Sequence, residues 1–76
     1  MNRCIIIGNK VTGSIETGDV LSSDANIISS NLFTRASGYN LYLGSQANYN
    51  VVVGNVYNST IHVSGTDNTV ANNQSY

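Results

Sequence analysis

The stretch "NVVVGN", residues 50–55, places three consecutive valines between two asparagines. A strand with one face in a core and the other in water alternates apolar with polar residues. This stretch does not alternate, so a second surface must cover its outer face. A similar six-residue pattern occurs four times along the chain, as CIIIGN at 4–9, NIISSN at 26–31, NVVVGN at 50–55 and NTVANN at 68–73.

The four copies predict a coiled chain in which each copy occupies the same place in a successive coil. The unequal distances between the copies indicate loops of variable length. We expect the first, third, sixth and eighth positions to point inward. The first holds Cys4, Asn26, Asn50 and Asn68; the third holds Ile6, Ile28, Val52 and Val70; the sixth holds Asn9, Asn31, Asn55 and Asn73; and the eighth holds Val11, Phe33, Tyr57 and Ser75.

Three short strands are predicted in each full coil. The third of them is centred on Ile15, Leu41 and Ile61 in successive coils, and Phe33 and Tyr57 are expected to stack between neighbouring coils. The chain is rich in Val, Ile, Thr and Tyr and contains no Pro, which favours strands joined by Asn, Gly and Ser turns. We therefore expect an all-β fold without helices.

The asparagine at the sixth position is predicted to form a ladder. Like residues in stacked coils lie about 4.8 Å apart, so one amide can donate to the coil on one side and accept from the other. A buried Asn at a sharp bend tolerates the left-handed backbone conformation, which we expect these residues to adopt. The alternative is that Asn is simply common in loops, but the fixed spacing disfavours it. The predicted ladder consists of Asn9, Asn31, Asn55 and Asn73.

Charge and cysteine content exclude several functions. With three basic and four acidic residues, the chain lacks the basic surface that nucleic-acid binding needs. The single cysteine, Cys4, allows neither an intrachain disulfide nor a cysteine-based zinc site, and His62 has no second His or Cys at ligand spacing. The apolar run CIIIG is too short to span a membrane. We expect no nucleic-acid partner, no metal, no cofactor and no membrane insertion.

The outward positions of the repeat predict an aliphatic stripe. If Asn50 and Val52 point inward, Val51 and Val53 point outward, because side chains alternate along a strand. Exposed apolar patches of this kind mark interfaces, and a chain of 76 residues supports only a marginal core alone. The alternative is a register shifted by one residue, which would turn the stripe into the core. The expected self-association interface consists of Ile5, Ile7, Ile27, Val51, Val53 and Ala71.

A second candidate site lies on the outer face of the third strand. Glu16, Tyr42 and His62 each follow the inward residue of their coil, so they should form one column. Tyr39 and Arg35, in the longest insertion, would extend it. An aromatic ring flanked by an acid and an imidazole could stack on a sugar and bind its hydroxyls, which predicts carbohydrate binding. The alternative is a solvated face or the rim of an interface.

Catalysis by this chain is not predicted. Cleavage of a glycosidic bond uses two carboxylates at a defined separation. The acidic residues Glu16, Asp19, Asp24 and Asp67 instead lie in turn contexts, where Asp commonly caps the backbone. One histidine and no nucleophile motif leave no arrangement for covalent catalysis. A glycan-cleaving site would need residues outside this chain or across subunits.

The sequence pattern N-x-[IV]-x-x-N, followed two residues later by an aromatic or aliphatic residue, resembles the repeats of the pectate-lyase-like superfamily. This superfamily includes polysaccharide lyases, epimerases and the trimeric tailspikes and tail appendages of bacteriophages. The resemblance implies a right-handed parallel β-helix of about three coils that forms a homotrimer. The left-handed hexapeptide β-helix is the rival fold, but it needs coils of regular length. The expected single domain spans residues 1–76, with coils starting near Cys4, Asn26, Asn50 and Asn68.

Three functions follow from these expectations. The leading hypothesis is a structural and assembly module of a tailspike-like protein, located in the virion tail or otherwise extracellular, with other copies of itself as partner. The second is a carbohydrate-binding module for a host-surface polysaccharide. The third is a non-catalytic part of a polysaccharide-degrading enzyme. We expect the chain to be a fragment or terminal module of a longer protein.

Overall fold

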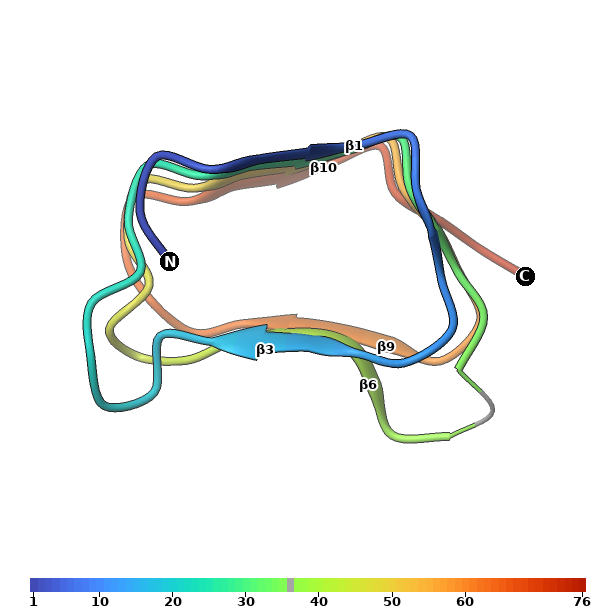
Figure 1. Cartoon of the computed structure of the whole chain (residues 1–76), viewed down its shortest axis with the longest axis horizontal. Coiled ribbons are helices and arrows are strands. Elements are labelled where there is room, and N and C mark those ends of the chain that lie inside the picture. The colour runs from blue at the N-terminus through green and yellow to red at the C-terminus, as the bar shows by residue number, and fades with distance from the viewer. Residues whose placement is uncertain (36) are drawn as a thin grey trace.

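The computed structural model describes residues 1–35 and 37–76, which wind into a parallel β-solenoid of about three turns (Figure 1). The described residues form three parallel sheets and no helix. The first sheet contains β1 (Ile5–Ile7), β4 (Ile27–Ser29), β7 (Val51–Val53) and β10 (Thr69–Ala71). The second contains β2 (Lys10–Val11), β5 (Leu32–Phe33), β8 (Val56–Tyr57) and β11 (Gln74–Ser75), and the third contains β3 (Ile15–Thr17), β6 (Tyr39–Leu43) and β9 (Thr60–Val63).

The strands pair in the register that the repeat predicts. The third positions of the repeat are partners along the first sheet, in the order Ile6, Ile28, Val52 and Val70. The eighth positions are partners along the second sheet, in the order Val11, Phe33, Tyr57 and Ser75. The third sheet aligns Ile15, Leu41 and Ile61. The predicted coil of three short strands is therefore confirmed, and loops of unequal length project between the strands (Figure 1).

The core is formed by inward positions of the middle coils. Val52 is fully buried, whereas Val51 and Val53 are only half-buried, so the alternative register is excluded. Ile6 in the first coil is half-buried and Val70 in the last is 47% exposed, because each has a neighbouring coil on one side only. The fully buried apolar side chains are Ile28, Phe33, Leu41, Leu43, Ala47 and Val52.

The predicted ladder of sixth-position asparagines is present. At each step the Oδ1 of the later Asn accepts two hydrogen bonds from the earlier one. Asn73 accepts from the main-chain N–H of Asn55 at 3.0 Å and from its Nδ2 at 2.9 Å. The Nδ2 of Asn73 also donates to the carbonyl oxygen of Val52 at 3.1 Å. The same three bonds connect Asn31 to the coil of Asn9 and Asn55 to the coil of Asn31.

A second ladder with the same geometry runs along the first positions of the repeat. Asn50 accepts from the main-chain N–H of Asn26 at 2.9 Å and from its Nδ2 at 2.8 Å, and donates to the carbonyl oxygen of Ser23 at 2.9 Å. Asn68 extends this ladder, and the main-chain N–H of Cys4 begins it by donating to Asn26 at 2.9 Å. Every buried side-chain nitrogen and oxygen of the described residues has a partner, so the polar corners carry no desolvation penalty from an unmade bond.

The left-handed backbone conformation occurs one residue earlier than predicted. The ladder asparagines were expected to adopt it, but Ser30 (φ 56°) precedes Asn31 and Tyr49 (φ 59°) precedes Asn50. The physical reason is that the main-chain N–H of each ladder Asn must point along the solenoid at the next amide, so the bend is made by the preceding residue. The other residues at these bends are Arg3, Gly8, Ala25, Gly54, Asp67 and Asn72.

Candidate functional site

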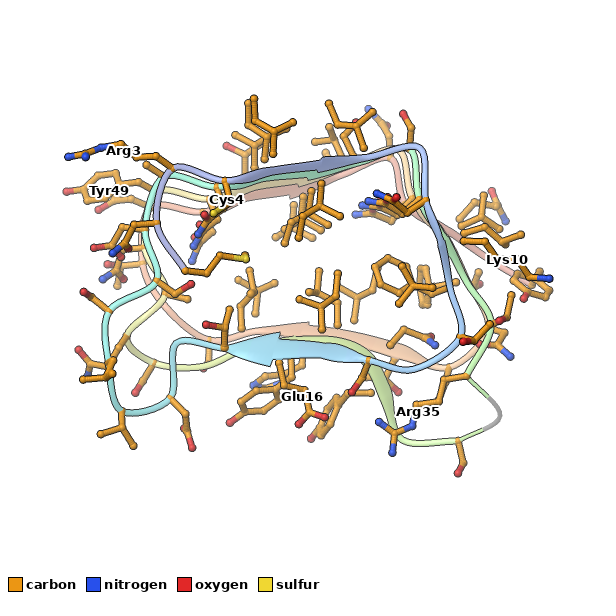
Figure 2. The ribbon with its side chains drawn as sticks, in the orientation of Figure 1. Arg3, Cys4, Lys10, Glu16, Arg35 and Tyr49 are labelled. Carbon is orange, nitrogen blue, oxygen red and sulfur yellow. The ribbon has the colours of Figure 1, made fainter. Side chains whose placement is uncertain are left out.

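The aliphatic stripe lies on the outer face of the first sheet. One column pairs Ile5, Ile27, Val51 and Thr69, and the next pairs Ile7, Ser29, Val53 and Ala71. Ile5 is 67% exposed and Ile7 is 54% exposed. Figure 2 shows side chains that point outward from the first sheet, whose strands β1 and β10 are labelled in Figure 1. The structure thus brings all six residues of the predicted interface together on one face, with Ser29 and Thr69 as the polar members of the two columns.

The apolar surface continues around the next corner, beyond the six residues of the predicted interface. Leu32 and Val56 are partners on the second sheet, and both are exposed on its outer face. They lie between Lys10 and Gln74, which occupy the same column in the first and last coils. Each of these residues directly follows a sixth-position Asn that points inward. Because side chains alternate along a strand, the sequence already indicates that these residues point outward.

Glu16, Tyr42 and His62 form the predicted column on the outer face of the third sheet. Glu16 is the register partner of Tyr42, and Tyr42 is the register partner of His62. The rings of Tyr42 and His62 stack with their centroids 5.0 Å apart and their planes 11° apart. This separation is close to the spacing of neighbouring strands, about 4.8 Å. The two rings therefore lie one above the other along the solenoid axis.

Tyr39 and Arg35 join this column from the long insertion. The ring of Tyr39 makes an edge contact with Tyr42, with centroids 5.0 Å apart and planes at 61°, and lies 5.6 Å from the ring of His62. A bulge between Tyr39 and Leu41 brings Tyr39 into this position. Arg35 lies 3.7 Å from the carboxylate of Glu16, which also accepts a hydrogen bond from Ser14 at 2.6 Å. Figure 2 shows Glu16 and Arg35 directed away from the core.

The orientation of the rings limits how this column could bind a ligand. Because Tyr42 and His62 stack along the axis, each ring covers one face of the other, and their edges are directed outward. Sugars bind aromatic side chains mainly by lying on a ring face. Polar contacts are available instead from Glu16 and Arg35, which are 54% and 40% exposed. The column combines an ion pair with aromatic edges.

Two other acidic residues, Asp24 and Asp67, lie at turns. The Oδ1 of Asp24 accepts a hydrogen bond from the main-chain N–H of Asn48 at 3.0 Å, which is the capping role expected of Asp in this context. Asp67 occupies one of the left-handed bends. Among residues 1–35 and 37–76, no three His, Cys, Asp or Glu side chains are grouped so that they could hold a metal ion. The same residues include no helix that is long and apolar enough to cross a bilayer.

These features define the chain as a parallel β-solenoid with two asparagine ladders, an exposed aliphatic stripe and an aromatic column. Comparison with protein-family models, with curated proteins and with solved structures finds no match. The solenoid class therefore rests on the structure itself. The pectate-lyase-like resemblance, the right-handed coil and the threefold assembly receive no support from relatives.

Proposed function

We propose that this chain is a structural and assembly module: a stiff right-handed β-helix segment that forms a homotrimer through the aliphatic stripe. It would act as part of a tailspike-like appendage, in a virion tail or another extracellular assembly. The observation that carries the proposal is the exposure of Ile5 and Ile7 in two regular columns on the first sheet. A continuous apolar face of this kind is costly to leave in water and is typical of an interface.

Two further features support a structural role. The two ladders connect every coil to the next through side-chain amides as well as through the sheets, so the module resists bending between coils. The two columns of the stripe repeat at the strand spacing, so the stripe of one copy can pack against the same stripe of another. The threefold arrangement follows from the resemblance to tailspikes.

The test is the mass of the protein in solution, measured by light scattering or sedimentation equilibrium. We expect three times the monomer mass, and we expect Val51→Lys to dissociate the assembly because it places a charge in the stripe. The matched control is Val20→Lys, since Val20 is 85% exposed in the loop after β3 and lies outside the stripe. A monomeric wild-type protein, or a Val51→Lys variant with unchanged mass, would contradict the proposal.

A second candidate function is the binding of a polysaccharide such as one from a host surface. The observation that favours it is the grouping of Tyr39, Tyr42 and His62 beside the Arg35–Glu16 ion pair, since aromatic edges and charged groups that can bind hydroxyls converge there. Binding to a glycan array should fall after Tyr42→Ala. Tyr49→Ala is the control, because Tyr49 is 66% exposed at a corner away from the column. Binding that survives Tyr42→Ala would remove this candidate.

The proposal includes no catalytic step. Glu16 is engaged by Arg35 and Ser14, and the carboxylate of Asp24 caps a turn. Release of reducing ends from an oligosaccharide by the purified chain, abolished by Glu16→Gln, would contradict this part of the proposal.

A further inference from the structure

We infer that the proposed trimer closes by packing the aliphatic stripe of one copy against the outer face of the second sheet of the next copy. The partner is a second copy of this chain, and the inference rests on the proposed function. A contact about a twofold axis can pair the stripe with itself. About a threefold axis, each contact instead joins one patch of a copy to a different patch of its neighbour. The trimer therefore needs a second apolar patch on every copy.

The outer face of the second sheet supplies this second patch. It consists of Leu32 and Val56, which are register partners on β5 and β8. Leu32 is 38% exposed and Val56 is 36% exposed, although both strands have a neighbouring strand on each side. Figure 2 shows Lys10, which lies in the same column, projecting outward from this face. Stacking of the coils therefore leaves the second patch open, and a copy lying alongside can cover it.

The stripe and the second patch match each other in position. Only Gly54 and Asn55 separate Val53 of the stripe from Val56 of the second patch, so the two faces adjoin at one corner. Residues of both patches repeat at the strand spacing of about 4.8 Å. In a parallel trimer, Val53 of one copy then lies at the level of Val56 of the next. The same match recurs in the neighbouring coil, so the two faces stay in register.

The corner between the two faces is small and uncharged. A Cβ added at Gly8 would have no atom within 4 Å, and one added at Gly54 would meet only the Oγ of Ser30 at 4.0 Å. No large side chain therefore keeps this corner away from a neighbouring copy, and three such corners can meet at an axis. The residues of this corner in successive coils are Gly8, Ser30, Gly54 and Asn72.

The opposite corner of the first sheet has a different character. It has the same left-handed backbone, but it includes long and charged side chains, and Figure 2 shows Arg3 and Tyr49 projecting from it. Protein interfaces have an apolar centre and a polar rim. The small corner therefore belongs at the threefold axis, and the opposite corner belongs at the rim. The residues of this rim corner are Arg3, Ala25, Tyr49 and Asp67.

The test is a matched pair of arginine substitutions, followed by sedimentation equilibrium. Ser30 at the small corner and Ala25 at the rim corner lie in the same coil, are both exposed and have φ values of 56° and 59°. Arg3, with φ 52°, shows that arginine fits this backbone. Ser30→Arg places three charges together at the axis and should raise the dissociation constant of the trimer by at least about a hundredfold. Ala25→Arg should change it by less than about threefold.

A charge pair identifies the two faces that meet. Val53→Lys and Val56→Glu should each dissociate the trimer, because each places one unpaired charge in the contact. The chain that carries both changes should assemble with a dissociation constant at least about tenfold below that of either single variant, since Lys of one copy then faces Glu of the next. A stripe packed on the same stripe would bring lysines together, and the double variant would show no recovery.

The outcomes separate this inference from the proposed function. A wild-type trimer in which Ser30→Arg and Ala25→Arg have equal effects would overturn the inference and leave the assembly module standing. A trimer whose double charge variant shows no recovery would do the same. A monomeric wild-type protein would overturn both. Circular dichroism of each variant shows whether the fold is retained, and Ala25→Arg provides the folded reference.

Discussion

The Oδ1 of Asn55 accepts two hydrogen bonds from Asn31, one from the main-chain N–H at 3.0 Å and one from Nδ2 at 3.1 Å. Asn55 also donates its own Nδ2 to Asn73 at 2.9 Å and to the carbonyl oxygen of Ile28 at 3.0 Å. Its side chain therefore connects three successive coils from a fully buried position. A single amide thereby fixes the position of each coil relative to its two neighbours.

Replacing this amide should be among the most damaging substitutions in the chain. Asn55→Ala removes the acceptor of the main-chain N–H of Asn31 and of one N–H of its Nδ2, and each unsatisfied buried donor costs about 1–3 kcal/mol. We expect the free energy of unfolding to fall by about 3 kcal/mol or more in urea titrations at fixed protein concentration. Asn9→Ala is the control, since Asn9 is exposed in the first coil, and its loss should cost less than about 1 kcal/mol. Equal losses would contradict the ladder's role.

Gly65 is required by close packing between coils. A Cβ at this position would overlap the carbonyl oxygen of Ala47 and would lie 3.0 Å from Oδ1 of Asn48. The backbone of Ala47 cannot move aside easily, so Gly65→Ala should lower stability by about 2 kcal/mol. Gly13→Ala is the matched control, because nothing lies within 4 Å of its added Cβ. Thermal unfolding of the two variants should separate them, and equal midpoints would show that the coils can shift apart there.

The left-handed bends predict opposite effects for two adjacent serines. Ser30 has φ 56°, a conformation that costs a non-glycine residue roughly 1–2 kcal/mol. Ser30→Gly should therefore raise the unfolding free energy by about 0.5 kcal/mol after the greater freedom of the unfolded chain is subtracted. Ser29 lies in β4, where Gly weakens the strand, so Ser29→Gly should lower it by about 0.5–1 kcal/mol. Both changes remove the same contact between the two hydroxyls, and urea midpoints that move in the same direction would refute the assignment of strain.

The stacked rings of Tyr42 and His62 should be energetically coupled. Aromatic pairs contribute about 0.5–1.5 kcal/mol beyond the area that they bury. A double-mutant cycle with Tyr42→Ala and His62→Ala should give a coupling of about 1 kcal/mol, measured from urea unfolding. A parallel cycle with Tyr42→Ala and Tyr49→Ala should be additive, because Tyr49 belongs to another corner. No coupling in the first cycle would mean that the stack contributes no stability of its own.

The repeat made much of this fold predictable. The pattern N-x-[IV]-x-x-N fixes which residues face inward, and register in a stacked coil follows directly from it, as for Ile28 and Val52. The column of Glu16, Tyr42 and His62 was predictable for the same reason. The stripe was predictable because alternation along a strand leaves no other place for Val51 and Val53.

Other features were not encoded by the repeat. Residue type alone favours Asn31 over Ser30 as the left-handed residue, because it does not show that the N–H of Asn31 must point at Asn55. The contact of Tyr39 with Tyr42 depends on a bulge inside an insertion, and insertions interrupt the period from which positions are counted. The proposed pairing with other copies would involve surfaces whose partner the repeat does not specify.

The left-handed bends have a consequence for how such a chain can change over time. The ladder Asn that follows each bend makes the interior hydrogen bonds. The residue at the bend itself can therefore differ between coils, and it is Arg3, Tyr49, Asp67 or a glycine with the same backbone conformation. Two adjacent residues thus specify the interior and the exterior of the solenoid separately. A solenoid of this design can acquire new charge or new aromatic groups on its corners one coil at a time, while the amides beneath keep the same three bonds.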